Sequence, residues 1–377
     1  MSTPARTAIL DAIRDRGPIS FAEYMELALY GAGGFYEVPP VGAEGDFVTS
    51  PHVHPLFGEL LGRAIAELRS ELGDPAPFRI AEVGAGDGTL AIQLLGALGT
   101  DGLVYTAVER SAGARDLLAA IVGVTPRETL AETETETETE GDPHLILAHE
   151  LLDNLPFRRV RHTPDGPREV RIGSIGDRLV EVLVDPGTDA DLARAAAGLE
   201  PGEEAVVPDG ALAFVDDVAA ALRRGYALVI DYGDLGSSGG GTHGYRDHRV
   251  VDDPLDMPGE GDITAGVDFS VIAHRAGAVG LTAFPVVTQH RALMALGFEE
   301  WVRSELARQV ELLDERDGLG AVRTWTGRSR ATLLADPASL GRFKWLLLAT
   351  PGLPAPAWLE TAAPEAGDPP SAGYDAP

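Results

Sequence analysis

The sequence contains no cysteine, and this absence excludes several kinds of chemistry. Without thiols the chain can form no disulfide, no thiolate metal site and no cysteine nucleophile. It has a single lysine, Lys344, among 30 basic residues. No apolar run approaches the ~18 residues of a membrane-spanning helix, and the mixed-charge segment Met1–Arg16 lacks the apolar core of a signal peptide. These absences predict a cytoplasmic protein that does not enter a membrane.

The chain carries a formal net charge of −29, with 59 acidic and 30 basic residues. Nucleic acid binding relies on clustered lysine and arginine, so this balance argues against a nucleic acid partner. The same charge repels anionic membranes and attracts a basic partner, although solubility or adaptation to salt explains it equally well. The 377 residues are 44% hydrophobic and 24% charged, which suits one large globular domain or two smaller ones.

A glycine-rich turn follows an apolar strand near residue 80. The sequence reads Ile-Ala-Glu-Val-Gly-Ala-Gly-Asp-Gly-Thr-Leu over 80–90, and a helical pattern follows at once. Glycine is needed where the backbone turns tightly or approaches a ligand. This arrangement is typical of the first crossover in a nucleotide-binding α/β sheet. After Glu82 come Gly84, Gly86 and Gly88, so the third glycine lies one residue earlier than in the dinucleotide fingerprint.

A second acid supports a cofactor site at this turn. Residues 104–108 read as the next strand, which ends at Glu109, 21 residues after Gly88. That is about the distance at which an acid receives ribose hydroxyls. The Glu-x-Gly-x-Gly-x-Gly pattern resembles motif I of the class I S-adenosylmethionine (SAM) methyltransferases. The strand, the helix and the acid together argue against a glycine turn that binds nothing.

Apolar strands alternate with helical segments, which predicts an α/β fold with a mostly parallel, Rossmann-like sheet. We expect strands at 78–83, 103–109, 144–149 and 225–231. A capping box at Ser20–Glu23 predicts the start of a short helix, and apolar spacing predicts a longer helix at about 55–72. The predicted divisions are an N-terminal helical extension with a lid loop (1–75), the sheet domain (76–362) and a disordered tail (363–377).

Two inserts and an acidic repeat interrupt the sheet domain. The insert at about 156–206 contains β-like segments separated by Pro/Gly turns, and the insert at about 234–266 is rich in Gly, Asp and His. The histidine and aspartate spacing in the second insert matches no metal-site pattern, so we predict no metal. The repeat Glu-Thr-Glu-Thr-Glu-Thr-Glu-Thr-Glu at 132–140 imitates a strand, but its unpaired carboxylates predict a solvated loop.

Further segments identify a family. They are Gly-Asp-Phe-Val-Thr-Ser-Pro (45–51), Leu-Phe-Gly-Glu-Leu (56–60), His-Glu-Leu-Leu-Asp-Asn-Leu-Pro-Phe (149–157), Ile-Asp-Tyr-Gly (230–233), Gly-Tyr-Arg-Asp-His-Arg (244–249) and Pro-Gly-Glu-Gly-Asp-Ile-Thr-Ala-Gly-Val-Asp-Phe (258–269). Over roughly residues 18–300 the chain resembles the SAM-dependent methyltransferases of the mitochondrial complex I assembly-factor type, and it is identified as a bacterial member. The resemblance implies a class I methyltransferase fold, SAM as methyl donor with S-adenosylhomocysteine as product, and a protein acceptor methylated on arginine.

The chain departs from the family pattern at three places near the expected site. The family usually has Pro-Glu-Ile-Ser-Gln where this sequence reads Pro-His-Val-His-Pro (51–55). It usually has Asn-Glu at the position of His149-Glu150, and Thr-Gln-Gly near residues 288–290, which here read Thr-Gln-His. These differences concern the acceptor rather than the fold.

The cofactor side of the site follows from the resemblance and from the glycine turn. Backbone amides at Gly84, Gly86 and the following helix N-terminus are expected to receive the amino-acid portion of SAM. Glu109 is expected to accept from both ribose hydroxyls. Glu82 either contacts the SAM ammonium or braces the glycine loop. Gly88 completes the turn.

A lid over the cofactor is the next expectation. Ligands of such sheets lie beyond the carboxyl ends of the strands, so the 45–51 loop, with Thr49, Ser50 and Pro51, is expected to fold over SAM. The alternative is that Thr49 or Ser50 caps the helix region at 55–72.

The acceptor side is expected after the strand at 144–149. In class I methyltransferases, residues at this position lie beside the transferred methyl, which places Glu150 there. A carboxylate can hold a guanidinium in a bidentate pair. Asp153 shares this catalytic role or is simply a turn residue before Asn154. His149 is expected to contact the cofactor or act as a base, unless it is merely packed and hydrogen-bonded.

The predicted function is therefore SAM-dependent methylation of a protein, with arginine as the favoured acceptor. Two alternatives remain open. One is a non-catalytic assembly factor that retains a SAM pocket, and the other is an NAD-dependent oxidoreductase, against which the glycine spacing argues. The sequence leaves the oligomeric state open.

Overall fold

The computed structural model describes residues 3–37, 49–134, 141–236, 242–246, 249–251, 253–256 and 258–363. The lid loop up to residue 48, the Glu-Thr repeat from residue 135, parts of the second insert and the tail from residue 364 lie outside the described residues. The predictions for those segments therefore stay predictions.

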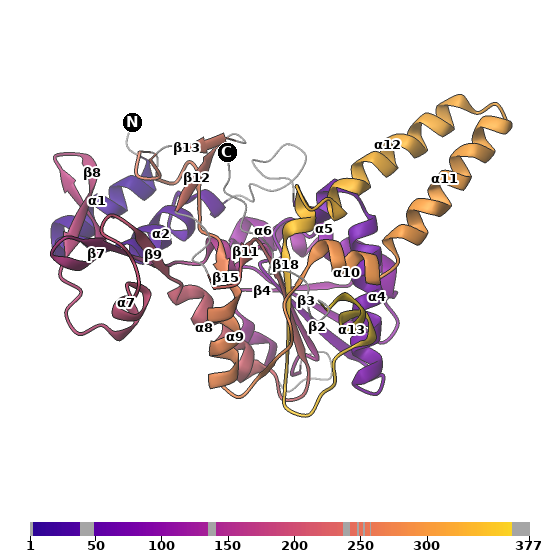
Figure 1. Cartoon of the computed structure of the whole chain (residues 1–377), viewed down its shortest axis with the longest axis horizontal. Helices are drawn as coiled ribbons and strands as arrows, with labels where there is room; N and C mark the ends of the chain where they lie inside the picture. Colours follow the sequence, from indigo (N-terminus) through magenta and orange to yellow (C-terminus); the bar gives the residue numbers. More distant parts are fainter. Residues whose placement is uncertain are drawn as a thin grey trace.

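An eight-stranded sheet forms the centre of the molecule, with strand order β16-β18-β10-β5-β2-β3-β4 and β17 beside β18 (Figure 1). Its parallel strands are β2 (Phe78–Val83), β3 (Leu103–Val108), β4 (Val124–Arg127), β5 (Leu145–His149) and β10 (Tyr226–Asp231). The antiparallel strands are β18 (Lys344–Ala349), β16 (Thr282–Ala283) and β17 (Val287–Thr288). The four predicted strands are confirmed to within one residue at each end, whereas β4 and β18 were not predicted.

Helices cover both faces of this sheet. One apolar core contains Phe78 and Ile80 of β2, and the other contains Ala81, because successive side chains of a strand point to opposite faces. The first core is covered by α4 (Leu56–Glu71), α5 (Thr89–Leu98), α6 (Ala112–Leu118), α10 (Gln289–Ala295) and α13 (Ala357–Ala362). The second core is covered by α8 (Asp209–Ala221) and α9 (Phe269–Ala278). This three-layer arrangement confirms the predicted α/β class.

A smaller lobe is built from the N-terminal segment and the first insert. Its five-stranded antiparallel sheet consists of β1 (Ile19–Ser20), β6 (Arg158–Thr163), β7 (Gly166–Ile175), β8 (Arg178–Val184) and β9 (Glu204–Val207). The helices of this lobe are α1 (Pro4–Arg16), α2 (Phe21–Met25) with a π-helical turn at Glu26–Tyr30, and α7 (Ala190–Ala195). Ser20 caps α2 as predicted, since the Glu23 N–H donates to Ser20 Oγ over 3.1 Å, whereas the Glu23 carboxylate forms an ion pair with Arg16.

Each lobe combines segments that are far apart in the sequence. Ile19 of β1 pairs with Ile172 of β7, so the N-terminal helices join the first insert. The helix predicted at 55–72 appears as α4 and packs on the central sheet instead. The segment before residue 75 therefore contributes to both lobes.

The remaining elements surround the carboxyl ends of the strands or project from the body. A three-stranded sheet is formed by β12 (His243–Arg246), β13 (Arg249–Val251) and β14 (Asp262–Thr264), and β11 (Gly233–Asp234) pairs with β15 (Val267–Asp268). Helix α3 (Ser50–Val53) precedes α4, and α11 (Phe298–Asp314) with α12 (Gly318–Ala335) forms a projecting hairpin (Figure 1). Single 3₁₀ turns lie at Phe35–Glu37, Leu130–Glu134, Leu152–Asn154 and Leu340–Arg342. Across the described ranges, every helix is too short or too polar to cross a bilayer.

Candidate active site

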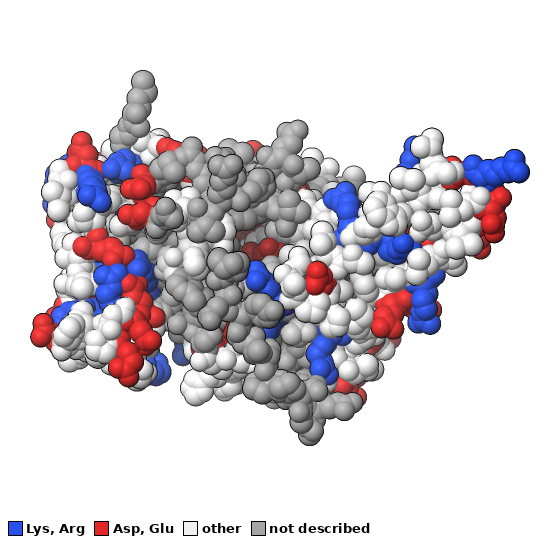
Figure 2. All heavy atoms as spheres, turned by 45° about the horizontal axis from the view of Figure 1, so that its top comes forward, with Lys and Arg blue, Asp and Glu red and all other residues white. Residues whose placement is uncertain are grey.

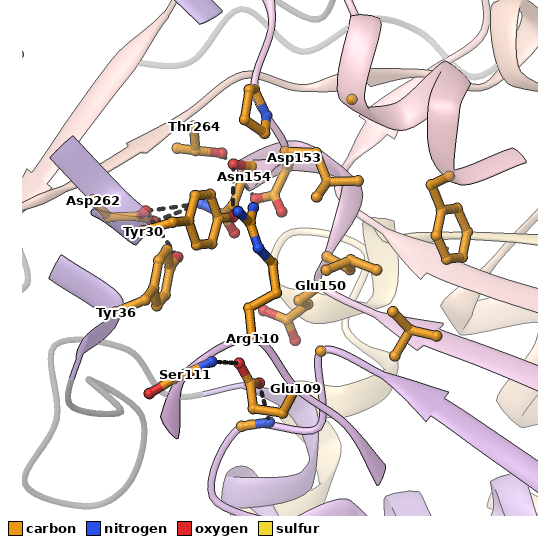
Figure 3. A pocket seen from close by; sticks show the side chains of 18 of the residues that line it. Tyr30, Tyr36, Glu109, Arg110, Ser111, Glu150, Asp153, Asn154, Asp262 and Thr264 are labelled. Atoms are coloured by element: carbon orange, nitrogen blue, oxygen red, sulfur yellow. Dashed lines mark hydrogen bonds between the residues drawn. The ribbon is translucent and has the colours of Figure 1, made fainter. Parts of the chain in front are cut away.

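A cavity of about 1080 Å³ lies where the carboxyl ends of the parallel strands meet the smaller lobe. Figure 3 shows Glu109 and Ser111 at one end, a cluster around Tyr30 and Asp262 at the other, and Glu150 between them. The volume suits a nucleoside-sized cofactor together with an acceptor side chain. The location follows the rule that ligands of open α/β sheets bind beyond the strand ends.

The glycine turn after β2 forms one wall of the cavity. Gly84, Gly86 and Gly88 all have left-handed backbone angles, with φ of 76°, 56° and 79°. A Cβ added at Gly84 would lie 2.9 Å from the Leu151 side chain, and one at Gly88 would lie 2.3 Å from Ile121. Glycine is favoured at Gly84 and Gly88 because it adopts a left-handed φ readily and has no Cβ to make these close contacts. Gly84 and Gly86 line the cavity, whereas Gly88 faces α6 and does not.

Glu109 is held directly against this turn. Its two carboxylate oxygens accept hydrogen bonds from the backbone N–H groups of Gly86, at 3.0 Å, and Ser111, at 2.9 Å. Those donors fix the carboxylate at the edge of the cavity, next to the close backbone approach that the glycines permit. The pairing of a glycine cradle with a fixed acid fits the ribose and amino-acid portions of SAM.

Glu82 lies behind the turn instead of in the cavity. Its side chain is buried and accepts a hydrogen bond of 2.7 Å from the Tyr105 hydroxyl. Burial raises the pKa of Glu82 to about 8, although the Tyr105 hydrogen bond lowers it. Of the two roles expected for Glu82, this position favours bracing the loop over direct contact with the cofactor ammonium.

Replacing Glu82 with glutamine is expected to alter how stability depends on pH. Because the folded pKa lies above the ordinary value of 4.5, this carboxyl contributes stability at low pH that is lost as the pH rises towards 8. The loss amounts to roughly 1.4 kcal/mol per pH unit in that window. Glu82→Gln should therefore melt near the wild-type temperature at pH 5 and above it at pH 9. Exposed Glu59→Gln is the control, and matching wild-type and Glu82→Gln profiles would contradict the prediction.

The lid residues form the short helix α3 and its N-terminal residue. Thr49 lines the cavity, whereas Ser50 and Pro51 are buried behind it. Neither Thr49 nor Ser50 caps α4, which begins after Pro55 without a side-chain cap. Ser50 instead donates its backbone N–H to Glu150 Oε1 at 3.3 Å.

A hydrogen-bonded chain ties this lid residue to the glycine turn. The Thr49 hydroxyl lies 2.9 Å from His52 Nδ1, and His52 Nε2 lies 2.9 Å from Asp87 Oδ2. Asp87 also accepts from the Thr89 N–H at the start of α5. His52, one of the departures from the family pattern, thus links α3 to the cofactor loop. Sequence spacing offered no signal for this contact.

Glu150 occupies the middle of the cavity in an unusual backbone conformation. Its φ of 52° is left-handed, which costs a non-glycine residue free energy and is characteristic of functional sites. Burial, followed by the nearby Asp153 charge, raises the pKa of Glu150 to about 8. Its hydrogen-bond donor among the described residues is the Ser50 N–H.

His149 does not line the cavity. Its ring is buried against Phe57 at 5.1 Å, and burial followed by the His52 charge lowers its pKa to about 3. Its Nε2 lies 3.3 Å from Glu150 Oε1 without hydrogen-bond geometry. A histidine with this pKa is neutral and too weak to serve as a base near neutral pH, so the packed alternative is favoured.

Asp153 is the second acid that the sequence predicts on the acceptor side. Its Oδ2 accepts from the Thr264 hydroxyl at 2.8 Å, whereas its buried Oδ1 has no hydrogen-bond partner among the described residues. Burial, with the charges of Asp231 and Asp262, raises its pKa well above the usual range. A buried carboxylate surrounded by other acids favours a cationic ligand.

Asp231 shapes the turn that presents these acids. Its Oδ2 accepts from the N–H groups of Leu151 and Leu152 at 3.1 and 2.8 Å. Burial raises the pKa of Asp231 to about 7, against the lowering effect of these hydrogen bonds. It is fully buried, so its neighbour Tyr232 lines the cavity in its place.

The far wall was not predicted from the sequence. Asp262 of β14 accepts from the Asn154 amide, at 2.8 and 2.9 Å, and from the Tyr36 hydroxyl at 2.9 Å. Tyr30 stacks on Tyr36 at 5.5 Å (Figure 3). Tyr30 and Tyr36 come from the N-terminal segment and Asp262 from the second insert. Asn154 and Asp262 lie within segments that carry the family resemblance, but nothing in the sequence indicates that these residues meet in one cavity wall.

Arg110 closes the mouth of the cavity. Its guanidinium lies 4.3 Å above the Tyr30 ring and forms an ion pair with Glu26. The pair joins the end of β3 to the smaller lobe. Among the described residues, no group of three or more histidine or acidic side chains is placed to hold a metal ion.

Comparison with known proteins identifies the family. A family model described as "Putative S-adenosyl-L-methionine-dependent methyltransferase" matches residues 60–287, more than half of the chain. The chain belongs to this methyltransferase family. The enzyme is therefore a SAM-dependent methyltransferase, and the glycine cradle and Glu109 fit that cofactor. The NAD-dependent alternative loses its support.

Named relatives and a solved structure agree with this assignment. The methyltransferase is 29% identical to human "Protein arginine methyltransferase NDUFAF7, mitochondrial" over 334 residues, which cover 79% of this chain and 74% of the relative. The mouse protein of the same name is 31% identical over 310 residues, with 73% and 70% covered. A Burkholderia thailandensis protein solved with bound S-adenosyl-homocysteine shares the fold with a TM-score of 0.77, 26% identity and 94% of each chain covered.

Proposed function

We propose that this methyltransferase methylates arginine side chains of a protein. The observation that carries the proposal is the buried Oδ1 of Asp153, near Glu150 and away from the glycine cradle, which has no hydrogen-bond partner in the part of the chain that the structure describes. The described contacts of these two carboxylates come from Ser50, Thr264 and neutral His149. A guanidinium would supply the missing positive charge and enough donors for both acids.

The relatives support the same acceptor. The human and mouse proteins are named protein arginine methyltransferases, and the match covers at least 70% of their length. A protein acceptor with a basic or arginine-bearing surface also complements the net charge of −29. A bacterial origin and a cytoplasmic location accompany this proposal as predictions.

The chain's own residues would position the acceptor and handle its proton. Bound SAM supplies an electrophilic methyl group on its sulfonium. Glu150 and Asp153 would hold the guanidinium, orient one nitrogen towards the cofactor end and concentrate the positive charge on the other nitrogens. Glu150, with a pKa near 8, is suited to accept a proton as the nitrogen becomes substituted. Tyr30 and Arg110 would exclude water from the mouth of the cavity.

The experiment that tests the acceptor uses radiolabelled SAM. Purified enzyme is incubated with lysate from a strain lacking this gene, and the labelled protein is hydrolysed for amino-acid analysis. We expect label in methylarginine. Label in methyllysine or another residue would overturn the arginine proposal. SAM binding without transfer to any protein would favour the assembly-factor alternative.

Asp153→Asn is expected to lower kcat/KM for the acceptor by about 10-fold to 100-fold, because a charge-assisted hydrogen bond contributes about 1.5–3 kcal/mol. Affinity for S-adenosylhomocysteine should stay within a few-fold of the wild type, because Asp153 lies at the acceptor end. Asp116→Asn, an exposed acid on α6, is the matched control and should keep full activity. An equal loss of cofactor affinity would show that Asp153 supports the fold instead.

A further inference from the structure

The hairpin of α11 and α12 is fixed at its base and projects at its tip (Figure 1). At the base, Phe298, Ala331 and Leu334 are buried in the core of the central sheet. Trp301 packs edge-on against His54 at 5.3 Å. Beyond these anchors the two helices lie along each other and away from the body. The hairpin does not line the cavity, so the proposed reaction does not account for it.

Large apolar side chains are exposed along the hairpin. Val310 is 57% exposed and Trp325 52% exposed, although both are large enough to contribute strongly to a core. Seven of the 14 large hydrophobic side chains that are exposed in the described part of the chain lie here: Leu306, Val310, Leu313, Leu319, Val322, Trp325 and Leu333. We refer to these seven residues as the apolar face.

Helical spacing groups several of these residues on one side of each helix. On α11, Leu306, Val310 and Leu313 follow an i, i+4, i+7 pattern, so they form a single stripe. Val322 and Trp325 are three residues apart on α12 and therefore share one side of that helix. The opposite side of α11 carries Ser304, Arg308 and Glu311, and Figure 2 shows a largely uncharged stretch along the hairpin.

An exposed apolar face of this kind indicates a binding partner. Contiguous exposed apolar patches on soluble proteins mark interaction sites. Helices without tertiary packing are marginal in water, since most helical stability comes from burying an amphipathic face. A projecting two-helix hairpin buries only the side between its helices. The apolar face therefore points to a partner that brings further helices.

We infer that the partner is a second copy of this chain, whose hairpin packs antiparallel on the first to form a four-helix bundle with two-fold symmetry. The charges favour this occupant. Helix α11 carries five acidic residues and two arginines, whereas α12 carries three arginines and no acid. In the antiparallel arrangement, the acidic helix of each copy lies against the basic helix of the other.

The charges of the hairpin are available for this pairing. None of the ion pairs among the described residues joins α11 to α12. Arg323 of α12 and Glu311 of α11 are both exposed, so a partner can reach them. A purely acidic or purely basic partner would match one helix and repel the other, while a second copy matches both.

Sedimentation of the full chain tests this inference. The wild type is expected to sediment at micromolar concentration with twice the 39.7 kDa mass of one chain. Val310→Glu places a charge in the centre of the apolar face and should weaken self-association by at least roughly 100-fold. Ser304→Glu adds the same charge on the opposite side of α11 and should leave the dimer intact. A monomeric wild type, or a Val310→Glu dimer as tight as the wild type, would overturn the inference.

A second variant tests the same inference even if Val310→Glu fails to fold. The native chain has no cysteine, so Val310→Cys introduces a single thiol into the apolar face. With a short thiol-reactive cross-linker, Val310→Cys is expected to give covalent dimers, whereas Ser304→Cys is expected to stay monomeric on a denaturing gel. Equal cross-linking of the two variants would contradict pairing through the apolar face.

Discussion

Gly86→Val protein is expected to bind S-adenosylhomocysteine at least about 100-fold more weakly than the wild type. Gly86 has a φ of 56°, a conformation that a β-branched residue adopts only at considerable cost. Its N–H also donates to Glu109 at 3.0 Å, so any shift of the backbone releases the acid expected to hold the ribose. A valine side chain would also enter the space that the cofactor needs. Titration calorimetry measures the loss.

A matched glycine on the next helix serves as control for that variant. Gly96 lies exposed near the end of α5 and does not have a left-handed φ, and a Cβ added there would meet no atom within 4 Å. Gly96→Val should keep the wild-type affinity. Should folded Gly86→Val protein bind the cofactor as tightly as Gly96→Val, the glycine turn would not be the cofactor site.

Glu150→Gln is expected to slow methyl transfer by at least about 10-fold, and by about 100-fold or more if Glu150 also accepts the proton. Glutamine keeps the size and hydrogen-bonding ability of the side chain but removes the charge beside the acceptor. Affinity for the cofactor should remain within a few-fold of the wild type, because Glu109 and the glycine turn are untouched. Single-turnover methylation measures the rate, and calorimetry measures the affinity.

The pH dependence of this variant separates catalysis from structure. Since burial raises the pKa of Glu150 to about 8, kcat/KM of the wild type should rise with pH up to about 8 as the carboxyl ionises. In Glu150→Gln that rise should be lost or strongly reduced. If Glu150 only stabilises the following turn, the variant will instead melt earlier and lose cofactor binding. Full activity in a stably folded variant would remove Glu150 from the mechanism.

The central fold could be predicted because its evidence is local. Strands β2, β5 and β10 are buried on both faces and therefore appear as short apolar runs between turns. β18 is equally apolar after Lys344, but it pairs antiparallel with β10 from more than 100 residues away, and nothing local indicates that partner. An apolar run by itself does not reveal which sheet it joins.

The candidate site also contains residues that the sequence predicts and residues that it does not. Glu109 could be placed at the cavity from its spacing after the glycine turn, and Glu150 and Asp153 from their position after a strand, while their roles stay predictions. Spacing alone could not show whether Glu82 contacts the cofactor or braces the glycine loop. Its burial and its hydrogen bond to Tyr105 favour the second role. Tyr30 and Asp262 depend on contacts between distant segments, which sequence periodicity does not encode.

The pairing of β1 with β7 has a consequence for the order in which the two ends of the cavity form. Ile19 pairs with Ile172, so β1 is synthesised well before its strand partner, and the glycine turn, β3 and β5 are all made in between. Contacts between such distant positions are slow to form because the intervening chain must be closed into a loop first. The cofactor end, built from segments close in sequence, can therefore assemble earlier than the Tyr30 wall. If the two ends serve the proposed roles, a chain still being synthesised is expected to bind the cofactor before it can bind an acceptor.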